Sequence, residues 1–220
     1  MATPQPSIFM QEHGILYVRE EYRQAQMGVS TVLGGGEFRD LTTSHEWWID
    51  TDNVQRTKRA TIEWLEDGPH LVGADGSDGS NKWWLIDTTQ NITQAVYYDG
   101  KNPFGLSNLG DFLGIFSRDG KKLIEAVQRK EANQVGEAQQ APWGKVVSIR
   151  QTNPQTQQTI TSTVRADPPN ILIESVILDK EGKLFQSNRI TNWEWLDPST
   201  LPSDFWVSPP KDVPIGASHP

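Results

Sequence analysis

Residues 107–129 read SNLGDFLGIFSRDGKKLIEAVQR, and they form the one long stretch whose apolar residues repeat with a helical period. Four large apolar residues in it are spaced at i, i+3, i+4 and i+7, which places them on one stripe of a helix: Leu109, Phe112, Leu113 and Phe116. An apolar helical stripe has to be buried against another element, and the rest of the chain offers mainly strands. The stretch therefore predicts helical structure packed on a sheet.

The ends and the middle of this stretch carry further helix signals. Asn108 suits the N-cap position, and Asp111 places an acid in the first turn. Residues 117–120 (SRDG) interrupt the apolar period before Leu123 resumes it. The pattern therefore predicts two short helices joined at Gly120.

Outside this stretch, apolar and polar residues alternate in short runs that are typical of strands. The predicted strands cover residues 15–23, 46–50, 59–66, 70–74, 82–87, 93–98, 144–150, 159–165, 171–179 and 183–195. A helical turn is predicted over residues 7–13, a glycine turn at residues 34–36, a polar linker over residues 135–142 and a closing strand around residues 205–207. Short turns join most of the strands, which predicts an antiparallel, meandering sheet.

The predicted fold class is α+β, a single domain over residues 8–207 with flexible ends at residues 1–7 and 208–220. Two Trp pairs, at residues 47–48 and 83–84, put an indole on each face of their strands. A sheet that is apolar on both faces needs cover on both sides, or one face has to line a cavity.

Composition excludes several classes of function. The net charge of −8 argues against nucleic-acid binding, and the absence of Cys excludes disulfides and thiolate metal sites. The four His are scattered, so we expect no metal and no cofactor. Residues 75–81 (DGSDGSN) lack the calcium-loop spacing, because Gly79 occupies the third ligand position, and predict a hairpin loop. With no nucleophile elbow, P-loop or dinucleotide motif, we expect no catalytic residue and no enzyme.

The nine Trp allow three interpretations. They fill the core of a sheet that has few Leu and Ile, or they line a lipid site, or they form an exposed platform for sugar rings. The apolar stripe on the predicted helices favours the lipid interpretation over the sugar-binding one.

The order of these elements resembles the LolA-like superfamily, which includes periplasmic lipoprotein carriers and the lipoprotein-sorting and sigma-E regulatory (RseB/MucB) domains. The residues that carry the resemblance are Asp78-Gly79 leading into Trp83-Trp84-Leu85, and the run DFWVSPP at residues 204–210. It extends over residues 13–213. It implies a curved antiparallel sheet, an incomplete and half-open barrel, with a helical plug on its concave face and an apolar cavity between them. An arginine that helps to close the lid in family carriers has loose counterparts in Arg56 and Arg59.

The resemblance also implies what the domain does. We expect a non-catalytic, monomeric binding domain outside the cytoplasm, in the periplasm or at the cell surface, with any membrane anchor upstream of residue 1. Its partner would be a lipid or an acylated protein. The expected ligand-binding residues are Trp48, Trp64, Trp83, Leu109, Phe112, Leu113 and Phe116. The alternatives are a sensor domain that binds a protein partner, such as a membrane protein, and, with less support, a carbohydrate-binding module.

Overall fold

The structure is a computed structural model, which describes residues 13–30, 36–87, 94–103, 105–211, 213 and 215–216. The strands are β1 (Ile15–Ser30), β2 (Gly36–Asp50), β3 (Thr57–Leu65), β4 (Gly68–Ser77), β5 (Lys82–Asp87), β6 (Gln94–Asp99), β7 (Asn133–Ala141), β8 (Gly144–Thr152), β9 (Thr159–Arg165), β10 (Leu172–Leu178) and β11 (Leu184–Leu196). One α-helix, α1 (Leu109–Gln128), and a 3-10 turn at Pro198–Thr200 complete the described elements. The predicted helical turn at residues 7–13 and glycine turn at residues 34–36 lie largely outside the described residues.

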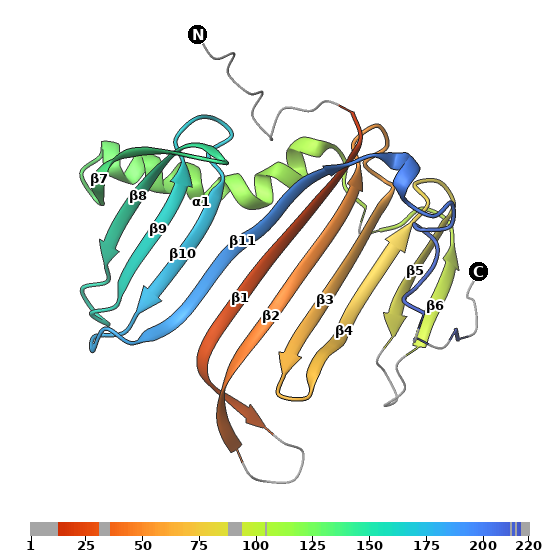
Figure 1. Cartoon of the computed structure of the whole chain (residues 1–220), viewed down its shortest axis with the longest axis horizontal. Helices are drawn as coiled ribbons and strands as arrows, with labels where there is room; N and C mark the ends of the chain where they lie inside the picture. Colours follow the sequence, from red (N-terminus) through yellow and green to blue (C-terminus); the bar gives the residue numbers. More distant parts are fainter. Residues whose placement is uncertain are drawn as a thin grey trace. The chain divides into compact units, whose positions relative to one another are not determined.

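The described strands form one antiparallel sheet in the order β6-β5-β4-β3-β2-β1-β11-β10-β9-β8-β7. Strands that are neighbours in the sheet are also consecutive in the chain, except for β1 and β11. The sheet therefore consists of two meanders that meet where β1 pairs with β11 (Figure 1). The strand order begins at β6 and ends at β7, so the sheet is not closed into a barrel. The predicted α+β class, with an antiparallel sheet and a helical insertion, is confirmed.

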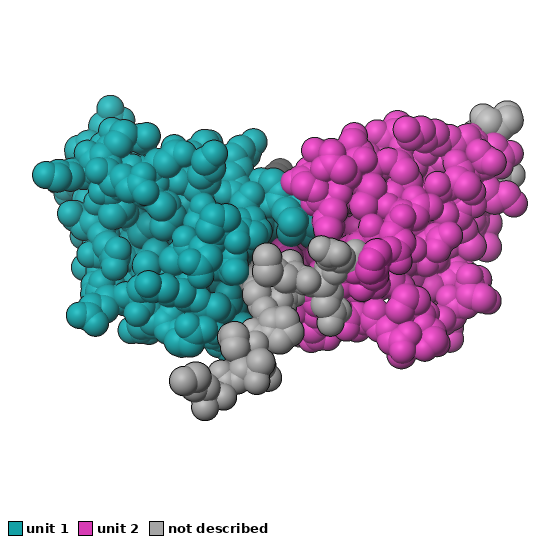
Figure 2. All heavy atoms as spheres, turned by 90° about the horizontal axis from the view of Figure 1, so that it is seen from above, with its two compact units in different colours: residues 1–10, 20–43, 112–190 teal, residues 11–19, 44–111, 191–220 magenta. Residues whose placement is uncertain are grey.

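The chain divides into two compact units (Figure 2). Unit 1 contains residues 1–10, 20–43 and 112–190, and unit 2 contains residues 11–19, 44–111 and 191–220. The single domain over residues 8–207 stays a prediction. Among the described residues, no helix is long and apolar enough to cross a membrane.

The core of unit 1 lies between the second half of α1 and strands β8 and β9. Its buried residues are Ala126, Ala132, Val147, Ile149 and Val164. Leu123, Ile124 and Val127 of the helix pack against this cluster. Nearer the start of the helix, the rings of Phe112 and Phe116 meet edge to face at 5.1 Å between centroids. Phe112 is completely buried and Phe116 nearly so, as the apolar stripe predicts.

The prediction of two helices joined at Gly120 is wrong, because α1 runs through this residue without a break. Gly120 is buried, and a Cβ atom built on it would overlap the backbone oxygen of Asn170, which lies just before β10. The glycine therefore allows the helix to approach the sheet closely. The predicted N-cap is confirmed, since the backbone N–H of Asp111 donates to Oδ1 of Asn108 at 2.9 Å.

The predicted polar linker over residues 135–142 is also wrong, because most of it is strand β7. This strand pairs with β8, and seven of its nine residues are exposed. With no buried face, its sequence NQVGEAQQA has no apolar alternation from which a strand is recognised.

In unit 2, one face of strands β3 to β6 is covered by the segment that follows β11. Trp84 is fully buried there and packs with Ala74 and Ile86. Its Nε1 donates to the backbone oxygen of Trp206 at 3.0 Å, and the Tyr97 hydroxyl donates to that of Val207 at 3.0 Å. Lys58 adds hydrogen bonds to two further carbonyl oxygens of the segment.

This segment is not the closing strand that the sequence predicts, because residues 203–207 form turns. Its contacts extend into the predicted flexible tail. Ser208 accepts a hydrogen bond from Lys58, and Ile215 forms a parallel bridge with Ala95 of β6. The flexibility of residues 208–220 stays a prediction.

The close approach at Gly120 predicts opposite effects of one substitution at two sites on α1. Gly120→Ala should lower the free energy of unfolding by about 1–3 kcal/mol, because the added methyl group forces the helix away from Asn170. Gly114→Ala is the matched control, since no atom lies within 4 Å of the point its methyl group would occupy, and it should raise stability by up to about 1 kcal/mol. Urea unfolding measures both. Equal effects at the two sites would contradict the close approach.

The burial of Phe112 gives a second prediction. Phe112→Ala should cost about 3–5 kcal/mol in urea unfolding, because it leaves a cavity in a packed interior. Ile115→Ala on the same helix is the control, and its 56% exposed side chain should change stability by less than about 1 kcal/mol. A loss below about 1 kcal/mol for Phe112→Ala would show that its ring is not part of a packed core.

Candidate functional site

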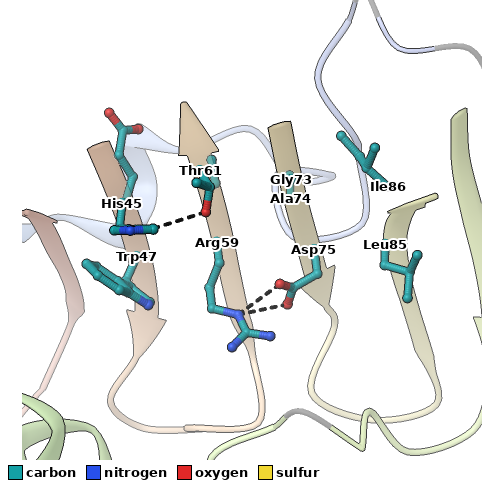
Figure 3. A pocket seen from close by; sticks show the side chains of 11 residues that line it. His45, Trp47, Arg59, Thr61, Gly73, Ala74, Asp75, Leu85 and Ile86 are labelled. Atoms are coloured by element: carbon teal, nitrogen blue, oxygen red, sulfur yellow. Dashed lines mark hydrogen bonds and ion pairs between the residues drawn. The ribbon is translucent and has the colours of Figure 1, made fainter. Parts of the chain in front are cut away.

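Unit 2 has a hollow of about 430 Å³ over strands β2 to β5 (Figure 3). It is lined by His45, Glu46, Trp47, Arg59, Ala60, Thr61, Gly73, Ala74, Asp75, Leu85 and Ile86. All of these residues belong to unit 2, so the hollow is formed within one compact unit.

The register of the strands explains which side chains meet in the hollow. Arg59 pairs with Asp75 across β3 and β4, and Asp75 pairs with Leu85 across β4 and β5. Directly paired residues share a face of the sheet, so these three side chains lie together. The side chains of their chain neighbours Ala60, Ala74 and Trp84 point to the opposite face, under the segment that follows β11.

A glycine leaves the hollow open in its middle. Gly73 pairs with Thr61, and no atom lies within 4 Å of the point where a Cβ atom would stand. The backbone of Gly73 has no left-handed conformation that would require glycine. A larger side chain therefore fits there, and the missing side chain is what leaves space above β4.

Two polar pairs lie in the hollow (Figure 3). Nε of Arg59 donates to both carboxylate oxygens of Asp75, at 3.1 and 2.8 Å. Nδ1 of His45 and Oγ1 of Thr61 share a hydrogen bond of 3.1 Å. Burial raises the pKa of the Asp75 carboxyl, while the charge and the hydrogen bond of Arg59 act in the opposite direction.

Apolar groups flank the polar pairs. Trp47 lies on the β2 side, with its ring centroid 5.8 Å from that of His45, and Leu85 lies on the β5 side. A ligand in the hollow would therefore meet an indole and an aliphatic wall, with an ion pair between them.

None of the seven predicted ligand-binding residues lines this hollow. Trp48 stacks on Tyr17 at 5.0 Å and meets the ring of Phe205, and Trp64 donates from Nε1 to the Ser44 hydroxyl. Both lie on the face of the sheet opposite the hollow. Nζ of Lys58 lies 4.4 Å from the centroid of the Phe205 ring, and Lys58 pairs with Gly76 on the covered face, which places Trp48 there too. Trp64 follows Lys58 by six positions in β3, and this even spacing puts it on the same face.

The other predicted residues lie elsewhere. Trp83 shares the face of the hollow but is buried beyond its edge, stacked on Tyr98 at 4.3 Å. Leu109 belongs to unit 2, whereas Phe112, Leu113 and Phe116 belong to unit 1. A role of these seven residues in ligand binding stays a prediction.

The residues that do line the hollow have weak signals in the sequence. Arg59 stands out only through the family resemblance, and Asp75 only as the start of a loop. Gly73 and Asp75 occupy alternate positions of β4, and Arg59 and Thr61 occupy alternate positions of β3, so each pair lies on one face of its strand. This pattern is the sequence signal of a polar face. It becomes visible only once the register of the two strands is known.

The hairpin loop predicted for residues 75–81 corresponds to the turn between β4 and β5. Oδ1 of Asp78 accepts hydrogen bonds from the backbone N–H groups of Ser80, Asn81 and Lys82, at 2.7, 3.1 and 3.1 Å. The carboxylate therefore closes the β4–β5 hairpin, as predicted. Within the described part of the chain, no group of three or more His, Asp or Glu is placed to hold a metal ion.

Comparison with known proteins found no matching family model and no matching curated protein. Similar solved structures include an uncharacterized conserved protein from Thermus thermophilus, with a TM-score of 0.35 and 8% identity, covering 91% of this chain and 90% of that one. MucB in complex with MucA(peri) gives a TM-score of 0.37 and 10% identity, covering 92% of this chain and 57% of that one. A putative outer membrane lipoprotein-sorting protein domain from Vibrio parahaemolyticus gives 0.29 and 8%, covering 87% and 89%.

This chain thus spans less than two thirds of the MucB chain. The neighbours include MucB and a lipoprotein-sorting domain, which are the kinds of protein that the sequence resembles. At these identities and TM-scores, function has to be argued from the site of this chain itself.

The raised pKa of Asp75 predicts a pH-dependent contribution to stability. Because burial raises this pKa above its usual 3.8, the contribution of the carboxyl to stability is fully present below about pH 3.8 and is lost as the pH rises through the raised value. The unfolding free energy of the wild type minus that of Asp75→Asn should therefore fall as the pH rises above about 3.8. Urea unfolding across this range measures the difference, and a difference that is constant or rises with pH contradicts the assignment.

Proposed function

We propose that this chain is a non-catalytic binding domain that works outside the cytoplasm and holds an apolar ligand, a lipid or the acyl chain of a lipoprotein. The observation that carries the proposal is the hollow over β2 to β5. Its volume of about 430 Å³ falls in the range of small-molecule sites, roughly 300–1,000 Å³. Each CH₂ group that enters it from water gains about 0.8 kcal/mol, so a chain laid between Trp47 and Leu85 is a suitable occupant.

The polar groups of the hollow support binding rather than catalysis. His45 and Thr61 form a base and a hydroxyl in contact, which are two parts of a nucleophilic arrangement. The third part is a carboxylate that orients the base, and the nearby carboxylate of Asp75 is held by Arg59 instead. These contacts favour a role of the polar groups in positioning a ligand over a role in nucleophilic attack on it.

The test uses the space above Gly73. In the full chain, the series Gly73→Ala, Gly73→Val and Gly73→Leu should progressively weaken uptake of methyl decanoate, because the side chains occupy the hollow. The series should leave the free energy of unfolding within about 1 kcal/mol of the wild type, since nothing lies within 4 Å of the point where the new Cβ atom would stand. Uptake is followed by the shift of Trp emission, and native mass spectrometry with organic extraction identifies any lipid that co-purifies.

Two results would overturn the proposal. Uptake that is unchanged in Gly73→Leu would place the ligand outside the hollow. A folded wild type that takes up no methyl decanoate and carries no lipid would reject the apolar ligand, and would favour the sensor alternative, in which the domain binds a protein partner.

A further inference from the structure

Within the part of the chain that the structure describes, Arg59 is paired through only one of its three guanidinium nitrogens. Arg59 contacts Asp75 through Nε alone, and the dashed lines in Figure 3 reach only this atom. Among the described residues, no hydrogen bond to its two Nη groups is found. A guanidinium that is paired through Nε alone keeps up to four N–H donors on its Nη atoms for another acceptor. The side chain of Arg59 is 39% exposed and lines the hollow, so a ligand has access to these donors.

The charge of Arg59 is nevertheless already balanced. Asp75 lies within hydrogen-bond distance, and its side chain is only 16% exposed, so solvent screens it weakly. The neighbouring carboxylate of Glu46 faces Arg19, whose Nη1 lies 3.8 Å from its Oε1. His45, the remaining titratable group of the wall, shares its Nδ1 with Thr61. The wall therefore offers hydrogen-bond donors without a net positive charge.

This combination treats two kinds of acyl head group differently. An ester or amide carbonyl accepts a hydrogen bond from Nη without adding charge. The carboxylate of a free fatty acid, bound at the same place, would lie about 4–6 Å from the carboxylate of Asp75, a distance at which like charges disfavour each other. The repulsion is stronger in a half-buried site than in water.

We propose that the Arg59–Asp75 pair is a charge filter, through which the hollow accepts acyl chains in ester or amide linkage and rejects free fatty acids. This inference rests on the proposed function of the hollow. Arg59 supplies the contact to the carbonyl oxygen of the ligand, and Asp75 supplies the discrimination, because its charge cancels that of Arg59. The specificity for the linkage is then set by Asp75, on β4, and not by the apolar walls.

The experiment compares two ligands with the same chain, N-methyldodecanamide and dodecanoate, at pH 7.5 and below their micelle concentrations. The full chain is titrated as wild type, as Asp75→Asn and as Arg59→Gln/Asp75→Asn. The wild type should bind the amide about tenfold more tightly than the carboxylate, the scale of a one-unit electrostatic shift. Asp75→Asn should bind the carboxylate about tenfold more tightly than the wild type does, and should leave amide binding within about threefold. The double variant should bind the amide and the carboxylate about equally.

Asp40→Asn is the matched control. It removes one carboxylate from another ion pair, in which Asp40 accepts from Nη2 of Arg23 at 2.8 Å, and it lies outside the hollow. It changes the net charge of the chain by the same amount as Asp75→Asn, so it should leave both affinities unchanged.

The outcomes separate the filter from the proposed function. Equal binding of the two ligands by the wild type, or no gain of carboxylate affinity in Asp75→Asn, overturns the charge filter while the binding function stands. A gain in Asp40→Asn equal to that in Asp75→Asn assigns the effect to net charge and also overturns the filter. No binding of the amide by the folded wild type rejects the proposed function itself.

Discussion

The buried indole of Trp84 is the contact on which the arrangement of unit 2 depends. It is fully enclosed, and its Nε1 donates to the backbone oxygen of Trp206, 122 residues further along the chain. A buried indole N–H without an acceptor is costly, so this bond fixes the segment that follows β11 against one face of the sheet. Gly76 permits the approach, because a Cβ atom there would come within 2.6 Å of that same oxygen.

The segment that follows β11 covers one face of the sheet in unit 2, and the hollow therefore forms on the other face. Strand geometry sends successive side chains to opposite sides, so the residues next to the core positions Ala60 and Ala74 point into the hollow. The core face takes apolar residues such as Ala74, Trp84 and Ile86. The hollow face carries Arg59 and Asp75, which tolerate a half-buried surface because each satisfies the charge of the other.

Unit 1 also has a covered sheet face, and there the cover is helix α1. Gly120 lets α1 approach the chain at Asn170, just as Gly76 lets the segment that follows β11 approach β4. In both places a glycine is used for close backbone approach, in a conformation that other residues also adopt. Glycine therefore permits a close backbone approach in each unit, and at Gly73 it leaves space in unit 2.

Much of the local structure of this protein could be predicted from the sequence, because it depends on residues that are close together in the chain. The helical period of Phe112 and Phe116, the cap at Asn108 and the hairpin at Asp78 each involve residues within a few positions of one another. Prediction failed for β7, whose exposed polar residues carry no period, and at Gly120, where a tight contact was interpreted as a helix break.

The composition of the candidate site, in contrast, depends on pairings between strands. Arg59 meets Asp75 and Gly73 meets Thr61 because of the β3–β4 register, which shifts between Thr61 and Ile62. A shift of one residue moves every later side chain of a strand to the other face, so the pattern of one strand does not say what lies beside it. The predicted Trp residues illustrate this, since Trp48 and Trp64 lie opposite the hollow and Trp83 shares its face. The cover on each face is equally non-local, because it comes from backbone such as that of Trp206 and Asn170, far from the residues it contacts.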